Sequence, residues 1–119
     1  MADNNYYTLI IQNKASKEYF RYDKLINWAN SHLYYRFDVE LGVPDGEYAY
    51  CLFINNRSDV EIEYKNPLQE CILKIPGYED ILLRDLQPSN GLLRVGKEIK
   101  QENIYETGND KNNVFYYDE

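Results

Sequence analysis

The stretch Tyr34–Ile54, YYRFDVELGVPDGEYAYCLFI, decides the fold that this sequence predicts. Residues 35–41 alternate between apolar and charged side chains, which is the two-residue period of a half-buried β-strand. Residues 42–46 then contain a proline and an Asp-Gly pair, which favour a chain reversal. Residues 47–54 carry apolar groups on both faces, as a central strand does. The stretch therefore predicts a β-hairpin, which needs neighbouring strands because a lone hairpin is only marginally stable in water.

Further short strands are expected on both sides of this hairpin. Each has aromatic, aliphatic or β-branched residues between turn signals, and they are Tyr6–Gln12, Lys17–Tyr22, Val60–Tyr64, Gln69–Ile75, Ile81–Leu86, Leu92–Val95 and Val114–Tyr117. Asp23–Ser31 is expected to be a short turn or loop. With no linker or repeat, residues 1–119 are expected to form one all-β domain. The pattern predicts a single antiparallel β-sandwich, Ig-like or jelly-roll-like, of about seven or eight short strands.

Composition narrows the classes of partner. The formal net charge of −7 argues against nucleic acid as a ligand, because binding to phosphates needs clustered Lys and Arg. The first residues, MADNNYY, lack the basic start and apolar run of a signal peptide, and no stretch is long enough to span a membrane. We therefore expect synthesis in a cytoplasm, with no membrane and no nucleic acid as partner.

Residues that could carry chemistry are few. The single histidine, His32, could be grouped with Ser31 or Ser58, but no nucleophile elbow is present, which favours a loop histidine. Cys51 and Cys71 lie in predicted strands without further zinc ligands, which favours buried, reduced thiols. A disulfide between them is the alternative, and a cytoplasmic location disfavours it.

Acidic residues recur in same-face pairs, namely Asp38/Glu40, Glu61/Glu63 and Asp45/Glu47. Such pairs suit a calcium site or a glycosidase, but the solvated face of a strand is the favoured interpretation. Residues 108–112 resemble the start of a calcium loop, yet Val114 stands where the next oxygen ligand belongs. We therefore expect no catalytic residue, no cofactor and no metal.

Tyrosine is the unusual residue, with 13 in the chain. Many come in pairs, namely Tyr6/Tyr7, Tyr34/Tyr35, Tyr48/Tyr50 and Tyr116/Tyr117. One member of each adjacent pair should face outward, where tyrosine serves a protein interface or a sugar-stacking platform. Ordinary cross-strand ladders are the alternative. The residues expected at an interface are Tyr35, Tyr48, Tyr50, Tyr116 and Tyr117.

Three runs, Leu33–Leu41, Pro44–Tyr50 and Gly91–Gly96, together with the Tyr-rich Val114–Tyr117, resemble a known pattern. It belongs to small β-rich structural proteins of Bacteroidales phages and prophages, including crAss-like bacteriophages. In that pattern a strand, a Pro-Asp-Gly-Glu-Tyr turn and a second strand precede a Gly-Leu-Leu-Arg-hydrophobic-Gly strand. The first 30 residues and residues 55–90 carry no matching motif.

The resemblance implies a virion component without enzymatic activity, made in the host cytoplasm and assembled in many copies. The leading expectation is a capsid-decorating or head-fibre subunit that self-associates as a dimer or trimer and binds capsid or another fibre protein. The alternative is a carbohydrate-binding module in a host-recognition assembly.

Overall fold

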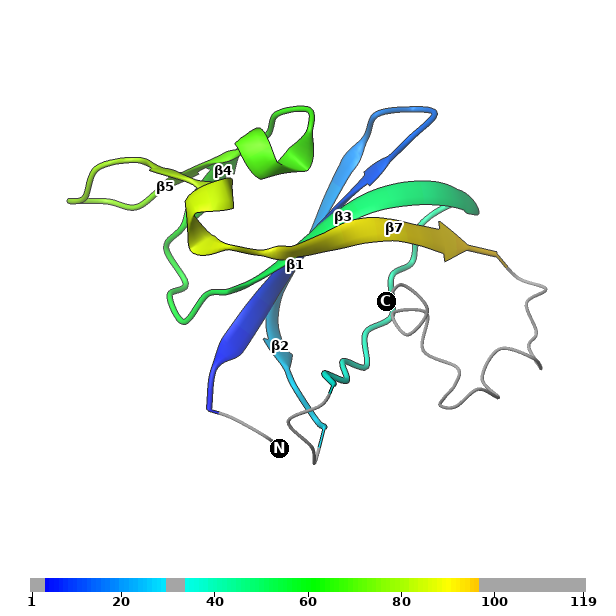
Figure 1. The fold of residues 1–119 in the computed structure, drawn as a ribbon, viewed down its shortest axis with the longest axis horizontal. Coiled ribbons are helices and arrows are strands. Elements are labelled where there is room, and N and C mark those ends of the chain that lie inside the picture. The colour runs from blue at the N-terminus through cyan, green and yellow to red at the C-terminus, as the bar shows by residue number, and fades with distance from the viewer. Residues whose placement is uncertain (1–3, 30–33, 97–119) are drawn as a thin grey trace.

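The computed structural model describes residues 4–29 and 34–96 (Figure 1). Within these residues the protein is mostly β, with seven strands in two antiparallel sheets. Sheet A has the order β2-β1-β3-β7, with β1 Tyr6–Asn13, β2 Tyr19–Ile26, β3 Gly46–Ile54 and β7 Ser89–Val95. Sheet B has the order β4-β5-β6, with β4 Glu61–Glu63, β5 Ile72–Lys74 and β6 Ile81–Leu82.

Two short 3-10 helices, η1 Leu68–Glu70 and η2 Leu83–Leu86, flank the strands of sheet B. Their leucines Leu68 and Leu83 are buried, and the amide of Leu83 donates a hydrogen bond of 2.8 Å to the carbonyl of Cys71. Sheet B and its helices lie over one end of sheet A, and the far half of β7 extends beyond them (Figure 1). None of the helices in the described part of the chain is long and apolar enough to cross a membrane.

Strand β1 lies at the centre of the molecule and is buried on both faces. Its two faces contribute to two hydrophobic clusters. The inter-sheet core joins sheet A to sheet B and consists of Ile10, Cys51, Phe53, Val60, Leu68, Cys71, Leu73 and Leu83. The outer core covers the opposite face of sheet A and consists of Leu9, Ile11, Tyr48 and Leu93. Consecutive β1 residues thus enter different clusters, as the alternation of side chains along a strand requires.

The expected all-β class and antiparallel sheets are confirmed, but the expected hairpin is wrong. Residues 34–45 form no strand, and β3 begins only at Gly46. The physical reason is that both hydrogen-bonding sides of β3 are already occupied, by β1 on one side and by β7 on the other. The segment before Gly46 is left as an extended strap whose alternation buries Phe37 without any strand partner among the described residues.

Several boundaries also differ from the prediction. Strand β2 runs on to Ile26, so Asp23–Ile26 belongs to a strand and not to the expected loop. The predicted strand Gln69–Ile75 is divided between η1 and β5, and Ile81–Leu86 is divided between β6 and η2. Strand β7 starts at Ser89, three residues before the predicted start at Leu92. The predicted strand at 114–117 lies outside the described residues.

Candidate protein-binding surface

A short strap of chain holds aromatic residues against the beginning of β1. The buried side chain of Asn27 accepts hydrogen bonds of 3.0 Å from the amides of Ala29 and Arg36. The amide of Trp28 donates in turn to the carbonyl of Arg36, at 2.8 Å. The two bonds to Arg36 tie residues 27–29 to residues 34–37, and the bond from Ala29 fixes the side chain of Asn27 within its own segment.

Three aromatic rings in mutual contact pack this strap against β1. Tyr7 and Phe37 are buried and meet edge to face, with ring centroids 5.0 Å apart. Tyr35 packs on both of them, at 5.9 Å from Tyr7 and 6.1 Å from Phe37, yet it remains 54% exposed. Such ring pairs add to the stability that buried area alone provides. Tyr35 is therefore an exposed ring on a rigid aromatic base.

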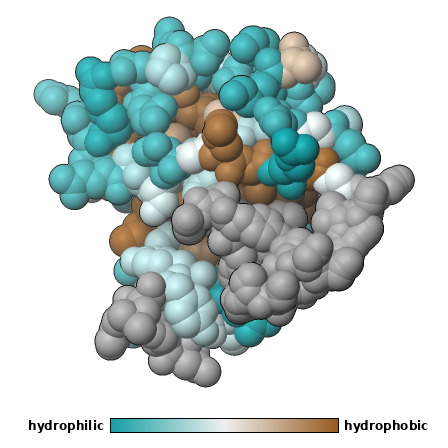
Figure 2. Space-filling view, turned by 45° about the vertical axis from the view of Figure 1, so that its right-hand side comes forward, coloured by the Kyte–Doolittle hydropathy of each residue, from teal (hydrophilic) through white to brown (hydrophobic). Residues whose placement is uncertain are grey.

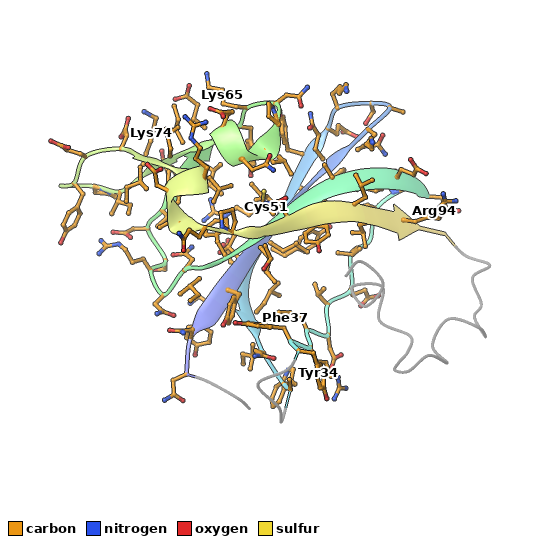
Figure 3. The ribbon with its side chains drawn as sticks, in the orientation of Figure 1. Tyr34, Phe37, Cys51, Lys65, Lys74 and Arg94 are labelled. Atoms are coloured by element: carbon orange, nitrogen blue, oxygen red, sulfur yellow. The ribbon has the colours of Figure 1, made fainter. Side chains whose placement is uncertain are left out.

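Trp28 and Tyr34 are also about half exposed, and together with Tyr35 we call them the aromatic end. Ile54, which is 50% exposed, lies opposite Tyr7 in the register of β1 and β3 and so borders this surface. Tyr34 and Phe37 lie at the end of the molecule away from Lys65 and Lys74 near sheet B (Figure 3). The aromatic end is thus separate from the surface that sheet B forms.

An ion pair lies beside the aromatic end. The guanidinium of Arg36 contacts the carboxylate of Asp38 at 3.0 Å, and both side chains are about half exposed. Half-exposed aromatic rings bordered by charged groups have the composition of a protein-binding surface, in which apolar anchors are surrounded by a polar rim.

The five tyrosines expected at an interface differ in how far the structure exposes them. Tyr35 is exposed as expected, but Tyr48 is fully buried in the outer core, where its hydroxyl donates a 2.7 Å hydrogen bond to the carbonyl of Pro44. Tyr50 is half-buried on the same face of sheet A. The expectation that Tyr48 lies at an interface is therefore wrong, because the face of β3 that carries Tyr48 is a core face. Tyr116 and Tyr117 lie outside the described residues.

Trp28 and Tyr34 were missed as candidate surface residues. Trp28 lies in Asp23–Ser31, which the sequence predicts as a turn or loop, and its partner segment begins only after residue 33, so no local pattern links the two. Tyr34 did carry a signal, because it is one member of an adjacent tyrosine pair. Both members of that pair are exposed, because the alternation of the strap buries Phe37 but leaves Tyr35, on the same face, 54% exposed.

One member of each predicted carboxylate pair forms an ion pair, and for Asp38 the partner is Arg36. The carboxylate of Glu63 lies 3.1 Å from the ammonium of Lys65 and 3.6 Å from that of Lys74. The hydrogen bond from Lys65 is the main cause that lowers the pKa of Glu63. Glu47 pairs with Arg94 at 2.8 Å across β3 and β7. Among residues 4–29 and 34–96 no group of three or more His, Cys, Asp and Glu side chains could hold a metal ion. His32 lies outside these residues.

The two cysteines are free thiols within the inter-sheet core. Burial raises the pKa of Cys51 to about 12 and also raises the pKa of Cys71. The sulfur of Cys71 accepts a hydrogen bond of 3.2 Å from the amide of Lys65. Because a thiolate is the reactive form of cysteine, a thiol kept neutral by burial serves packing and not nucleophilic chemistry. This placement agrees with the expectation of reduced, structural cysteines.

Comparison of the chain with protein-family models, with curated proteins and with solved structures finds no match.

Proposed function

We propose that this protein is a non-enzymatic structural subunit of a bacteriophage virion, either a capsid-decorating or a head-fibre protein. It would be made in the host cytoplasm, form a dimer or trimer, and attach to capsid or to another fibre protein. The finer fold that we propose is one Ig-like or jelly-roll-like sandwich. The phage context rests on the sequence resemblance described above, and the binding role rests on the aromatic end.

The observation that carries the binding role is an exposed aromatic surface on a preorganised base. Tyr35 is supported by the buried rings of Tyr7 and Phe37, and the backbone of Trp28 is fixed by its bond to Arg36. Rings that are already held in place lose little conformational entropy on binding. Each ring also offers a large contact area, which is why such residues dominate binding energy at protein interfaces.

Purified virus particles provide the test. Phage that encode Tyr34→Ala or Trp28→Ala should retain less of this protein through density-gradient purification than wild-type phage. Truncation of a central aromatic anchor costs about 2 kcal/mol or more of binding free energy. Tyr78→Ala is the matched control, because Tyr78 is 66% exposed and lies in the turn between β5 and β6. Absence of the wild-type protein from intact particles would reject the proposed role.

A carbohydrate-binding module is the second candidate, and the same surface favours it. Exposed aromatic rings can stack on sugar faces, and the neighbouring Arg36 and Asp38 could bond to hydroxyl groups. Binding of the isolated protein to a glycan array, lost in Tyr34→Ala and kept in Tyr78→Ala, would favour this candidate. Binding to particles without any glycan binding would favour the structural subunit.

A further inference from the structure

Strand β7 forms one edge of sheet A, and its outer side has no strand partner among the described residues. It pairs with β3 over all seven residues, Ser89–Val95, without a shift in register. A regular edge of this length presents a row of unpaired backbone amides and carbonyls, which another strand can extend. Leu92 stands at its centre and is 59% exposed.

The opposite edge of sheet A is protected in a way that β7 is not. Strand β2 has a bulge, since its partners on β1 shift between Tyr7 and Leu9, and Lys24 in this bulge has a φ of 60°. Asp23 also lies in this bulge, and Arg21 lies shortly before it. Bulges and charges of this kind prevent an edge from pairing with another chain.

The edges of sheet B are shorter than β7. Strand β4 has three residues and β6 has two, which offers few backbone groups to a further strand. Hydrophobic side chains reach the surface at the height of β7, whereas hydrophilic residues cover the upper part of the molecule (Figure 2). Strand β7 is therefore the long, regular and unprotected edge of the described chain.

The sequence of β7 is compatible with pairing to itself. Only one antiparallel register about a two-fold axis uses all seven residues, and in it Leu92 faces Leu92 of the second copy. Asn90 then faces Arg94, and Gly91 faces Leu93. Arg94 is the only charged residue in the strand, so no like charges face each other, and it is already paired with Glu47 of its own chain.

From these observations we infer that two copies of this protein associate through their β7 strands, which joins their two A sheets into one continuous antiparallel sheet. The inference deepens the proposed function, on which it rests, by naming the self-association surface. One strand pair buries less than the roughly 1,600 Å² of a standard interface, so the dimer should be weak in solution. Many linked copies on a particle would compensate for this through multivalency.

The test is sedimentation velocity of the full chain from about 5 to about 500 μM, a range that covers micromolar dissociation constants. Leu92→Lys should raise the dissociation constant at least about tenfold, because it places two ammonium groups face to face on the two-fold axis. Leu86→Lys is the matched control with the same charge change, since Leu86 is 40% exposed on η2. It should dimerise as the wild type does.

Two substitutions at Asn90 test the register. Asn90→Asp places a carboxylate opposite Arg94 of the second copy and should strengthen the dimer, whereas Asn90→Lys places like charges there and should weaken it. Circular dichroism and melting temperatures should show that all four variants fold. A failure of the proposed virion role would leave these results unchanged, because they concern the isolated chain.

Three results would overturn the inference. One is a wild-type protein that stays monomeric over the whole range. Another is a dimer that responds equally to Leu92→Lys and Leu86→Lys, which would place the interface elsewhere. The third is protection of β7 amides from hydrogen exchange that does not depend on concentration and is lost in Phe115→Asp. That pattern would show the chain's own residues 114–117 on this edge.

Discussion

Gly46 marks the point where the irregular strap ends and the central strand β3 begins. Its φ of 150° lies in a region that side-chain-bearing residues rarely adopt, as the Asp-Gly pair led us to expect. A Cβ at this position would meet Asn13 and Tyr48 only at ordinary distances of 3.5 and 4.0 Å. The requirement for glycine here is therefore conformational and not a matter of space.

Gly46→Val should lower the free energy of unfolding by about 1 kcal/mol or more, because the new side chain is strained in this backbone conformation. Denaturant titration of the wild type and the variant measures the effect. Gly42→Ala is a useful comparison, because Gly42 has a φ of 61° in the strap with open space around it. An unchanged midpoint for Gly46→Val would mean that the start of β3 is misplaced.

The burial of Cys51 makes the stability of the protein depend on pH. Its pKa is raised from 9.0 to about 12 in the folded protein. Below pH 9 the thiol is neutral in both states and its burial carries no electrostatic penalty. Between these two values the unfolded thiol ionises while the folded one stays protonated, so the unfolded state binds fewer protons. Stability that is fully present below pH 9 is therefore lost as the pH rises towards 12.

We expect the free energy of unfolding to fall more steeply above pH 9 in the wild type than in Cys51→Ala. The limiting slope for one thiol is about 1.4 kcal/mol per pH unit. The variant also loses packing, but that loss is the same at every pH, so the difference in slope isolates the thiol. Urea titrations between pH 7 and about 10.5 provide the measurement, in the range where the unfolded thiol ionises. Parallel curves for the two proteins would show that Cys51 ionises equally in both states.

At the scale of elements, a polar network links β2, β1 and the end of β3. The buried hydroxyl of Thr8 donates to Asp23 at 2.7 Å and accepts from the side-chain amide of Asn55 at 3.0 Å. Arg21 pairs with Asp23 at 3.0 Å and donates to the carbonyl of Val60 at 2.8 Å. The network therefore connects sheet A to the chain that enters sheet B.

Thr8→Val should destabilise the protein by about 1–2 kcal/mol, because it keeps the shape of the side chain but leaves Asp23 and Asn55 without their shared partner. Much of the Asp23 carboxylate reaches solvent, which keeps the expected cost at this level. Thr8→Ser is the control, since it retains the hydroxyl. Thermal unfolding should place Thr8→Ser between the wild type and Thr8→Val, and the reverse order would show that packing of the methyl group outweighs the network.

Strands with strong local signals could be predicted from the sequence. Strand β1 lies within one residue of its predicted range, and β4 lies within Val60–Tyr64. The pairing could not be predicted, because β3 takes its two neighbours from chain segments far before and after it. The alternation of apolar and charged side chains at 35–41 indicates that one face of the segment is buried, but it does not indicate whether a neighbouring strand pairs with it. The same limit explains Tyr48, whose exposure depends on what covers sheet A.

For the whole molecule, net charge opposes association, while the proposed contact itself brings no like charges together. Each copy carries a formal net charge of −7, so two copies repel each other at a distance. The β7 strand itself contributes only Arg94. If copies associate through this edge, long-range repulsion should be the main electrostatic contribution to the dissociation constant, and salt should weaken that repulsion.

We therefore expect the dimer to become several-fold tighter when NaCl is raised from about 0.01 to about 0.1 M, which shortens the Debye length from about 30 to about 10 Å. Sedimentation at both concentrations gives the two dissociation constants. Asn90→Asp should show a smaller salt effect, because its new attraction to Arg94 is screened by the same ions that screen the net repulsion. A wild-type dimer that weakens with salt would instead point to an interface held by ion pairs, which β7 does not offer.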